Sequence, residues 1–461
     1  MNQGLTIVPP PVVGEALRRL EARGFQAWCV GGCVRDSLLG KAPSDWDIAT
    51  SALPQETKAC FAGERLVEAG AAHGTIAWVP SGGHPIEITT FRSDGAYTDG
   101  RHPDSVAFSR RLEDDLSRRD FTVNAMAWHP QRGLVDLFHG QEDLSAGLLR
   151  CVGEPARRFS EDALRILRCL RFSSQLGFAI HPDTARALWE KRELLLALSH
   201  ERVREELTKL LCGQGAAAVL RQYAAVVFTV LPELAPMKGC AQETPYHCFD
   251  VWEHTLHAVD YAPQQGDLRW AALLHDAGKP GRKTRSADGV AHFYGHPPES
   301  GRIARQLLTR LRFSNKERDW IAALVDHHED AMPMGEAHLK GLLGRYGERF
   351  VFTLFQLQEA DMSAKAPGVF ARRLPDLEES RALARAILER GDCLTLGDMA
   401  LTGEDLKALG VAPGPEMGKL LRRLLEAVQR TGGAGQAPAE TGPIKRNAAG
   451  HPPRRGPAYL M

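Results

Sequence analysis

The 461-residue sequence lacks the features that mark exported and membrane-embedded proteins. The residues before Trp28 contain no long apolar segment, so we expect no signal peptide. No apolar run is long enough to span a bilayer, so we expect no membrane contact. The nine cysteines include no CxxC pair. We therefore expect a protein of the reducing cytoplasm, with no framework of disulfides.

The sequence also lacks an excess of charge of either sign. Lys and Arg together number 57, and so do Asp and Glu, which gives a formal net charge of zero. This balance argues against a protein coated throughout with basic residues for binding nucleic acid, but it is compatible with a local basic groove. The length is sufficient for two to four domains.

The most informative stretch runs from Trp28 to Thr50. A short apolar run ending at Val30 is followed by Gly31 and Gly32, where the pattern predicts the start of a helix that carries Arg35. Glycines let backbone N–H groups approach a phosphate closely, and a helix N-terminus favours an anion. The guanidinium of Arg35 would add charge-assisted hydrogen bonds. This combination predicts a phosphate cradle.

Two acidic residues, Asp45 and Asp47, follow this cradle on a predicted second strand. Residues two apart on a strand point to the same side, so we expect both carboxylates on one face of the sheet. Paired carboxylates beside a phosphate site suit two Mg²⁺ ions, about 3.5–4 Å apart, that catalyse phosphoryl transfer. The alternative is a Gly-Gly turn followed by two surface aspartates.

Together, the segment Gly31–Asp36 and the Asp45-x-Asp47 pair resemble the nucleotidyltransferase head of the polymerase-β superfamily. More narrowly, they resemble the bacterial family of CCA-adding tRNA nucleotidyltransferases and poly(A) polymerases. The resemblance implies an α+β head, a small mixed sheet with helices, followed by all-α neck, HD and tail domains. It also implies a third acidic residue on a following strand, for which Glu87 on the predicted strand 86–92 is the candidate.

A second motif lies at residues 118–125, Arg-Arg-Asp-Phe-Thr-Val-Asn-Ala. It resembles the second sequence block of the same family, in which Arg119 would bind a triphosphate oxygen. Asp120 and Asn124 are four apart on the start of a predicted helix, share a face, and would contact ribose hydroxyls. A helix start with a solvated basic pair would leave the order of these residues unexplained. Between the motifs, residues 93–104 predict a loop, which the resemblance implies is a flexible element.

The neck is predicted to contain a continuous helix over residues 159–172, capped by Ser160. Asp162 and Arg165 lie three apart on its polar face, and Arg168 and Arg171 continue that row. The Glu-Asp-x-x-Arg pattern resembles the helix that serves as the protein template for the incoming base in this family. The alternative is an ordinary salt bridge between Asp162 and Arg165 within the helix.

The polarity of this pair indicates which bases it would accept. A carboxylate only accepts hydrogen bonds and a guanidinium only donates them. Adenine and cytosine each present an amino donor beside a ring-nitrogen acceptor, whereas uracil and guanine present a carbonyl beside an N–H. A buried mismatch leaves two polar groups unpaired, at a cost of roughly 1–3 kcal/mol each. Asp162 with Arg165 therefore favours CTP and ATP over UTP and GTP.

A third cluster of chemistry-bearing residues begins after residue 245. His254, His275, Asp276 and His296 are separated along predicted helices, and either His328 or Asp326 would complete the set. Imidazole and carboxylate groups suit a divalent or transition metal. The pattern resembles the HD superfamily of metal-dependent phosphohydrolases, although such a domain can also be retained as a scaffold.

Binding of RNA is less visible in the sequence. Arg202, Arg204 and Lys209 lie on a predicted neck helix and would suit an RNA backbone, but a solvated helix face explains them nearly as well. No stacking aromatics or RNA-binding motif accompany them. The binding of tRNA is therefore implied by the resemblance alone.

We predict a tRNA nucleotidyltransferase that adds or repairs the 3′-terminal CCA from CTP and ATP with Mg²⁺. A poly(A) polymerase, an enzyme adding only CC or only A, an HD phosphohydrolase and an inactive RNA-binding protein remain alternatives, and the oligomeric state is open. The expected domains are a head 1–150, a neck 151–235, an HD domain 236–365, a helical C-terminal region 366–430 and a disordered tail 431–461.

Overall fold

The structure is a computed structural model that describes residues 7–94 and 106–431. The chain forms two compact units. The first contains the chain up to Ala331 together with Phe352–Leu377, and the second contains Met332–Val351 together with the chain from Glu378 onward. The predicted tail from residue 432 and most of the predicted loop 93–104 lie outside the described residues. Within the described part, no helix is long and apolar enough to cross a membrane.

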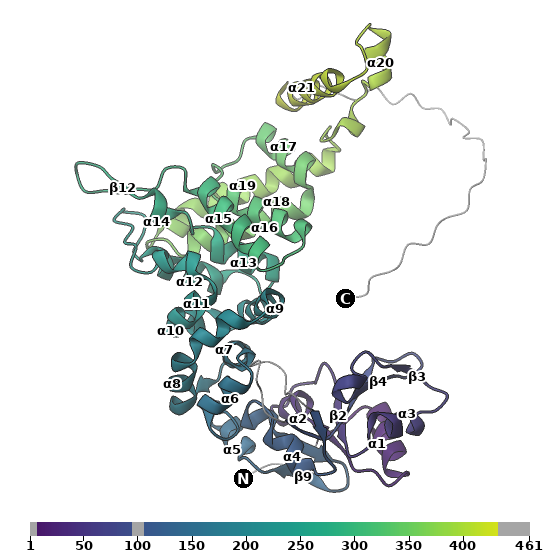
Figure 1. The fold of residues 1–461 in the computed structure, drawn as a ribbon. Helices are drawn as coiled ribbons and strands as arrows, with labels where there is room; N and C mark the ends of the chain where they lie inside the picture. The colour runs from purple at the N-terminus through teal and green to yellow at the C-terminus, as the bar shows by residue number, and fades with distance from the viewer. Residues whose placement is uncertain (1–6, 95–105, 432–461) are drawn as a thin grey trace, which may run out of the picture. The chain divides into compact units, whose positions relative to one another are not determined.

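The head is built on a seven-stranded sheet with strand order β3-β4-β5-β2-β1-β8-β9 (Figure 1). The strands are β1 Ala27–Val30, β2 Asp47–Thr50, β3 Arg65–Val67, β4 Thr75–Val79, β5 Ile86–Thr90, β8 Met126–His129 and β9 Gly133–Asp136. Only β2 and β5 pair in parallel; the other neighbours are antiparallel. The mixed sheet confirms the predicted fold class of the head. The predicted strand 86–92 ends at Thr90, and Arg92–Asp94 forms β6, which pairs with β7 Val106–Phe108.

Alternation along the strands separates the core from the functional face. In β5 the side chains of Ile86 and Ile88 are buried, whereas Glu87 is exposed. Helix α1 packs Leu17 and Leu20 into the core, where both are fully buried. The head helices are α1 Pro11–Glu21, α2 Gly32–Leu38, α3 Pro54–Cys60, α4 Leu112–Ser117 and α5 Gly140–Ser145, with 3₁₀ turns η1 Ala71–His73 and η2 Thr122–Asn124.

The neck is helical, and its helices α7 and α9 pack against each other. Its elements are α6 Pro155–Glu161, α7 Leu164–Leu176, α8 Pro182–Glu190, α9 His200–Leu211, α10 Ala216–Gln222, α11 Ala224–Val230 and the 3₁₀ turns η3 Arg192–Ala197 and η4 Pro232–Met237. A short parallel pair, β10 Leu148–Leu149 and β11 Ala179–Ile180, joins the start of the neck to the residues after α7.

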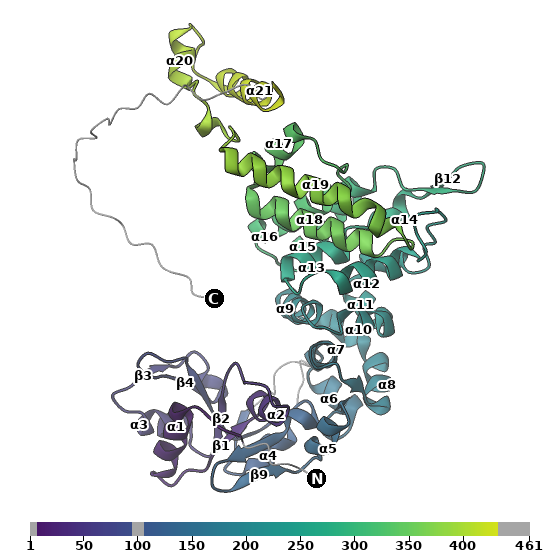
Figure 2. The same ribbon diagram turned by 180° about the vertical axis from the view of Figure 1, so that it is seen from behind.

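The next helices lie beside one another (Figure 2), and Trp270 on one of them is fully buried. They are α12 Val251–Tyr261, α13 Gly266–Leu274, α14 Lys279–Arg282, α15 His296–Arg310, α16 Asn315–His327 and α18 Glu348–Ser363, with the hairpin β12 Thr284–Arg285 and β13 Ala291–His292. The second unit contains α17 Glu336–Tyr346, which packs against α21 Pro415–Thr431, and also the C-terminal part of α19 Val369–Arg390, η5 Leu396–Asp398 and α20 Gly403–Ala408.

The packing of α9 against α7 leads to a prediction about stability. A Cβ atom on Gly213 would lie 2.7 Å from the backbone carbon of Ser174 in α7, so Gly213→Ala forces the two helices apart. We expect a loss of about 1–3 kcal/mol in the free energy of unfolding, measured by urea denaturation. Gly281→Ala, which adds a methyl group in open space, is the control and should stay within about 0.5 kcal/mol of the parent. Equal stabilities of the two variants would contradict this packing.

Candidate active site

Three carboxylates lie together at the centre of the head sheet. Asp47 opens β2 and is the direct cross-strand neighbour of Glu87 on β5. Asp45 lies two residues before Asp47, in the segment that leads into the strand, so the prediction that both aspartates are on a strand is wrong for Asp45. The buried Trp46 between them faces the core, and all three carboxylates line one cleft. Burial, together with repulsion from Asp45 and Glu87, raises the pKa of Asp47 to about 6.

The glycine motif forms the wall beside these carboxylates. Gly31 has φ 77°, a left-handed conformation that favours glycine, and a Cβ atom there would lie 2.9 Å from Arg119 Nη1. Arg35 on α2 donates from Nη1 to Asn124 Oδ1 over 2.7 Å. Arg119 is held in turn by the buried Asp115, with 3.1 Å between Nη2 and Oδ2. Two guanidinium groups therefore lie close to the glycines, as a triphosphate site requires.

Asp120 and Asn124 adjoin each other, but not on an α-helix: Asn124 ends the 3₁₀ turn η2, and Asp120 lies two residues before that turn. Asp120 Oδ1 accepts hydrogen bonds from Asn124 Nδ2 at 3.2 Å and from the Phe121 N–H at 2.8 Å. Its Oδ2 lies 2.6 Å from Arg168 Nη2. Burial opposes ionisation of Asp120, but Arg168 and these hydrogen bonds outweigh it and lower the pKa to about 2. Asp120 thus holds neck residue Arg168 in place, in addition to lining the cleft.

The predicted continuous helix over residues 159–172 is wrong. Glu154 caps α6 and Pro155 is its first residue, so Ser160 lies inside this helix and donates to the Ala156 carbonyl oxygen. The chain leaves the helix at Asp162, which has φ −141° and ψ 105°. Its Oδ1 accepts a hydrogen bond from the Leu164 N–H over 3.0 Å, so Asp162 caps the start of α7. Capping is a strong preference of aspartate, and here it overrides the apolar periodicity.

This break changes the contacts of Asp162 and Arg165. Arg165 Nη1 pairs with Glu161 Oε2 at 2.9 Å, and its Nη2 donates to the Arg118 carbonyl oxygen over 3.0 Å. Asp162 Oδ2 instead lies 3.5 Å from Arg202 Nη2 on α9. The alternative prediction, a salt bridge between Asp162 and Arg165 within one helix, is therefore wrong. Arg165 pairs with Glu161 instead. Asp162 and Arg165 both line the cleft.

The cleft has a volume of about 1210 Å³ and is strongly basic on its neck side. Its lining includes the predicted nucleotide-binding residues Gly31, Gly32, Arg35, Arg119, Asp120, Asn124, Asp162, Arg165, Arg168 and Arg171, and also Arg118, Arg202 and Lys209. Arg171 forms a buried ion pair with Glu206 over 3.1 Å. Arg204 is not part of this lining and donates to the Arg312 carbonyl oxygen. Of the three residues predicted to suit an RNA backbone, Arg202 and Lys209 therefore line the cleft and Arg204 does not.

A separate cluster of histidines is fully buried among α12, α13, α15 and α16. In each histidine Nδ1 faces a backbone carbonyl oxygen: His254 with Ala364 at 3.1 Å, His275 with Ala272 at 2.8 Å, His296 with Phe293 at 3.0 Å and His328 with Val325 at 2.7 Å. Because a carbonyl only accepts hydrogen bonds, these contacts assign the proton to Nδ1. The lone pair of each neutral imidazole then lies on Nε2.

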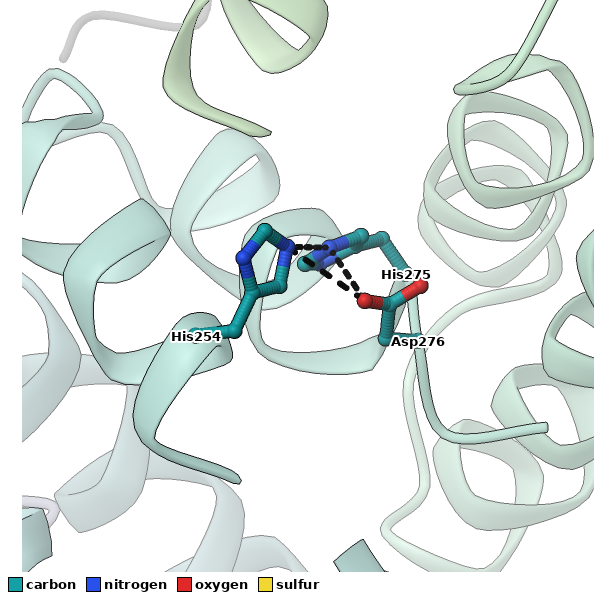
Figure 3. A group of neighbouring side chains, drawn as sticks. All are labelled: His254, His275 and Asp276. Carbon is teal, nitrogen blue, oxygen red and sulfur yellow. Dashed lines mark hydrogen bonds and ion pairs between the residues drawn. The ribbon is translucent and has the colours of Figure 1, made fainter. Parts of the chain in front are cut away.

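These Nε2 atoms converge in two pairs on Asp276. His254 and His275 have their Nε2 atoms 3.3 Å apart, and Asp276 Oδ2 lies 3.4 Å and 3.2 Å from them (Figure 3). His296 and His328 also have their Nε2 atoms 3.3 Å apart, on the side of Asp276 Oδ1. Two ring nitrogens that face each other without a proton between them are a donor set for a metal ion, and each group of three residues has this geometry.

The structure adds one candidate ligand and rejects another. Asp361 on α18 places Oδ1 2.9 Å from His254 Nε2 and 3.7 Å from His275 Nε2. The sequence did not indicate this ligand, because Asp361 lies 85 residues after Asp276. An acidic residue within the apolar stripe of a helix is the feature that could have pointed to it. Asp326 is instead paired with Arg305, so His328 rather than Asp326 joins the cluster.

The comparisons with known proteins agree with this geometry. Three family models match the chain: the poly A polymerase head domain over residues 27–150, a probable RNA and SrmB-binding site of polymerase A over 177–237, and the HD domain over 245–369. The CCA-adding enzyme of Leuconostoc mesenteroides is 50% identical over 413 residues, which cover 89% of this chain and 90% of the relative. That of Lactobacillus delbrueckii is 35% identical over 415 residues, 89% and 91% of the two chains.

A solved structure is also similar. The crystal structure of the Bacillus stearothermophilus CCA-adding enzyme in complex with CTP superposes with a TM-score of 0.71 at 30% identity, covering 93% of this chain and 95% of that one. The carboxylate cluster, the glycine cradle and the basic cleft define this protein as a nucleotidyltransferase. The chain belongs to the family of CCA-adding enzymes, which confirms the resemblance found in the sequence.

Proposed function

We propose that Asp45, Asp47 and Glu87 carry the transfer step by which this nucleotidyltransferase builds the 3′-terminal CCA of tRNA from CTP and ATP. The RNA 3′-hydroxyl attacks the α-phosphate, one phosphodiester bond forms, the α–β bond breaks, and pyrophosphate leaves. The observation that carries this assignment is the direct pairing of Asp47 with Glu87 across β2 and β5, with Asp45 lining the same cleft. We also propose that the enzyme acts in the cytoplasm; all nine cysteines lie in the described residues and are free.

The carboxylate cluster fits Mg²⁺. Carboxylate oxygens are the hard ligands that this ion prefers. Burial, together with repulsion from Asp45 and Glu87, raises the pKa of Asp47, and a bound cation would offset both effects. Mg²⁺ held by Asp45, Asp47 and Glu87 would neutralise the charge of the phosphates and activate the RNA 3′-hydroxyl group. The exposed Asp45 and Glu87 leave this side of the cleft accessible to substrate.

The triphosphate is assigned to the wall made by Gly31, Gly32, Arg35 and Arg119. Both guanidinium groups are oriented before substrate binds, Arg35 by Asn124 and Arg119 by Asp115. Such preorganised donors stabilise developing negative charge without reorganising during the reaction. We assign Asn124 and Asp120 to the support of this wall and of the ribose beside it.

Base selection is assigned to Asp162 and Arg165. Arg165 is buried and fixed by Glu161 and the Arg118 carbonyl, so its donors have a defined direction relative to the head. Asp162 presents carboxylate oxygens to the same cleft. One acceptor and one donor side by side match adenine and cytosine and oppose uracil and guanine. Arg168 and Arg171 support this edge through Asp120 and Glu206.

Replacing Asp47 tests the assignment of the transfer step. Asp47→Asn keeps the shape of the side chain but removes a charge, and we expect the rate of CMP addition to tRNA lacking CCA to fall by about 10³-fold or more. Because burial and repulsion from Asp45 and Glu87 destabilise the ionised Asp47, the variant should melt at or above the parental Tm without Mg²⁺. The exposed Glu113, changed to Gln, is the control. Addition by Asp47→Asn at a rate near that of the parent would refute the assignment.

The choice of base gives a second test. Asp162→Lys replaces acceptors with donors, so the ratio of kcat/KM for CTP and ATP to that for UTP and GTP should fall, by up to about 10⁴–10⁵ if all base contacts are lost. Asp162→Lys also removes the cap of α7, at a cost of about 1 kcal/mol.

Asp162→Asn keeps an oxygen that can cap α7 while changing the groups offered to the base, so it separates the two effects. We expect it to retain stability and to lose part of the discrimination. If both variants slow all four nucleotides equally, the role of Asp162 is structural and the template assignment is wrong.

A second candidate function belongs to the histidine cluster. We propose that His254, His275 and Asp361 would hold one divalent or transition metal ion and that His296 and His328 would hold another, with Asp276 belonging to both groups. The observation that favours this is the convergence of four Nε2 atoms on the two oxygens of Asp276. Metal ions in such a site supply a nucleophilic hydroxide at neutral pH, which suits a phosphohydrolase activity independent of CCA addition.

Metal analysis tests this proposal directly. The purified protein should contain about two metal ions per chain, because each of the two donor groups would hold one. Asp361→Asn should lower the content to about one ion, and His275→Ala should also lower it, because each removes donors from one group. Asp326→Asn is the control, since Asp326 pairs with Arg305 outside the cluster. All variants should add CCA at the parental rate; unchanged metal content in His275→Ala and Asp361→Asn would refute the site.

A further inference from the structure

One aromatic ring lies among the arginines of the cleft. Phe172 follows Arg171 directly on α7, and of the described residues that line the cleft it is the only phenylalanine, tyrosine or tryptophan. It is 8% exposed, and the ring of Phe121 packs against it at nearly a right angle, with 5.9 Å between the two centroids. Burial of an apolar side chain explains this packing, but it does not explain the groups that lie over the ring.

Three guanidinium groups lie over the ring of Phe172. The central carbon of Arg171 is 4.1 Å from the ring centroid, that of Arg35 is 5.2 Å away and that of Arg168 is 5.3 Å away. All three lie within the distance of about 6 Å at which a cation is attracted to the negative face of an aromatic ring. A single ring therefore attracts three like charges at once.

The three arginines come from both the head and the neck. Arg168 and Arg171 are on α7 with the ring, and Arg168 is four residues before Phe172, so the two side chains are neighbours on the helix surface. Arg35 is on α2 of the head. The ring therefore contacts the head wall to which we assign the triphosphate and the neck arginines to which we assign support of base selection.

Two polar partners fix Arg35 relative to the head. Its Nη1 donates to Asn124 Oδ1 over 2.7 Å, and its Nη2 lies 2.8 Å from Asp36 Oδ1. Both partners belong to the head, whereas the ring of Phe172 belongs to α7 of the neck. The contact with the ring therefore places the Arg35 guanidinium relative to the neck as well.

Like charges that lie this close repel one another. Burial lowers the pKa of Arg171, and the positive charges of Arg168 and Arg35 lower it further. Glu206 and Asp120 act in the opposite direction. The face of an aromatic ring also offsets part of the repulsion, because it carries partial negative charge. The ring therefore stabilises the three guanidinium groups next to one another before a substrate anion binds.

The ring is not available to a nucleotide base. A base that stacks on an aromatic side chain needs an open face of the ring. The guanidinium group of Arg171 covers one face at 4.1 Å, the ring of Phe121 packs against Phe172 as well, and little of Phe172 is exposed. Phe172 therefore acts through the arginines and not by touching the substrate.

We propose that Phe172 is a positioning residue for the triphosphate, because its ring holds the Arg35 guanidinium beside the two arginines of α7. This inference rests on the assignment of Arg35 to the triphosphate in the proposed function. Without the ring, repulsion from Arg168 and Arg171 displaces the Arg35 guanidinium, and the arrangement that receives the phosphates is populated for only part of the time. The apparent affinity for the triphosphate falls by that fraction.

The contribution of the ring is the same for every nucleotide. CTP, ATP, UTP and GTP share the triphosphate, and a change at Phe172 leaves the side chains of Asp162 and Arg165 in the chain. Loss of the ring therefore weakens all four nucleotides, and pyrophosphate as well, by the same factor. A role of Phe172 in the choice of base would instead change the ratio among the four nucleotides.

Fluorination of the ring tests the electrostatic part of this role. Phe172 is replaced in the full-length enzyme by phenylalanine that carries one, two or three ring fluorines, which keep the shape of the ring but withdraw electron density from its face. We expect the Kd of pyrophosphate with Mg²⁺, measured by titration calorimetry, to rise stepwise, by about fivefold with three fluorines, because a cation contributes this much over a partly buried ring. A Kd that does not depend on the number of fluorines would overturn the proposal.

Substitution tests the need for a ring. Phe172→Leu should raise the Kd of CTP, ATP and pyrophosphate by about five- to tenfold, and Phe172→Tyr, which keeps a ring, should stay within about twofold of the parent. Phe313→Leu is the control, since it removes a ring that Arg204 contacts outside the cleft lining. The ratios of kcat/KM among the four nucleotides should stay parental in Phe172→Leu. A changed ratio with an unchanged Kd of pyrophosphate would overturn the proposal.

A double-mutant cycle separates this inference from the assignment of Arg35. Arg35→Gln should raise the Kd of pyrophosphate by about tenfold in the parent, because it removes a charge-assisted contact. In Phe172→Leu the same change should have an effect at least about twofold smaller, since the two side chains act together. Equal effects in the two backgrounds would overturn the role of Phe172 and leave the assignment of Arg35 intact. No effect of Arg35→Gln in the parent would refute that assignment, and with it the role of Phe172.

Discussion

Two arginines of α7 hold the part of the neck to which we assign base selection against the part of the head to which we assign the triphosphate. Arg165 donates to the Arg118 carbonyl oxygen, and Arg168 pairs with Asp120 over 2.6 Å. Both contacts end in the motif that also carries Arg119, which lies over Gly31. In the function that we propose, a base bound at Asp162 is therefore held at a fixed distance from the triphosphate. Without this connection the choice of base would have no influence on where the α-phosphate lies relative to Asp47 and Glu87.

The residues that form this connection between neck and head are charged and largely buried, and the free-energy cost of burying them explains why each one is paired. Burying a carboxylate and a guanidinium is expensive unless each is paired and its remaining hydrogen bonds are satisfied. Asp120 meets this condition, since its two oxygens accept from Asn124, Phe121 and Arg168. A formal net charge of zero for the whole chain thus conceals a strong local separation, with carboxylates at the centre of the cleft and arginines along its neck side.

Contiguous motifs made the head and much of the site predictable from sequence. Gly31, Asp47 and Asn124 lie in short patterns whose chemistry depends on neighbours in the chain, and the cleft contains them all. The predictions from sequence were wrong or incomplete where an interaction with a distant residue, or a competing local interaction, determines the structure. Asp162 ends one helix because its side chain caps the next, Asp361 joins the histidines only through helix packing, and β3 is a short strand that its sequence pattern did not predict.

The histidine cluster and the carboxylate cluster of the head differ in how completely their ligand atoms are positioned before a ligand binds. In the histidine cluster the backbone carbonyls fix each ring and Asp276 is fully buried, so the donors that we propose for metal ions are positioned without substrate. In the head, Asp45 and Glu87 are exposed and the carboxylates alone offer too few ligands for Mg²⁺, which takes octahedral coordination and is usually bound through one or two carboxylates plus substrate phosphates. The triphosphate must supply the missing oxygens. In the function that we propose, the nucleotide therefore completes the head site, and this couples the assembly of the catalytic centre to the base accepted at Asp162 and Arg165.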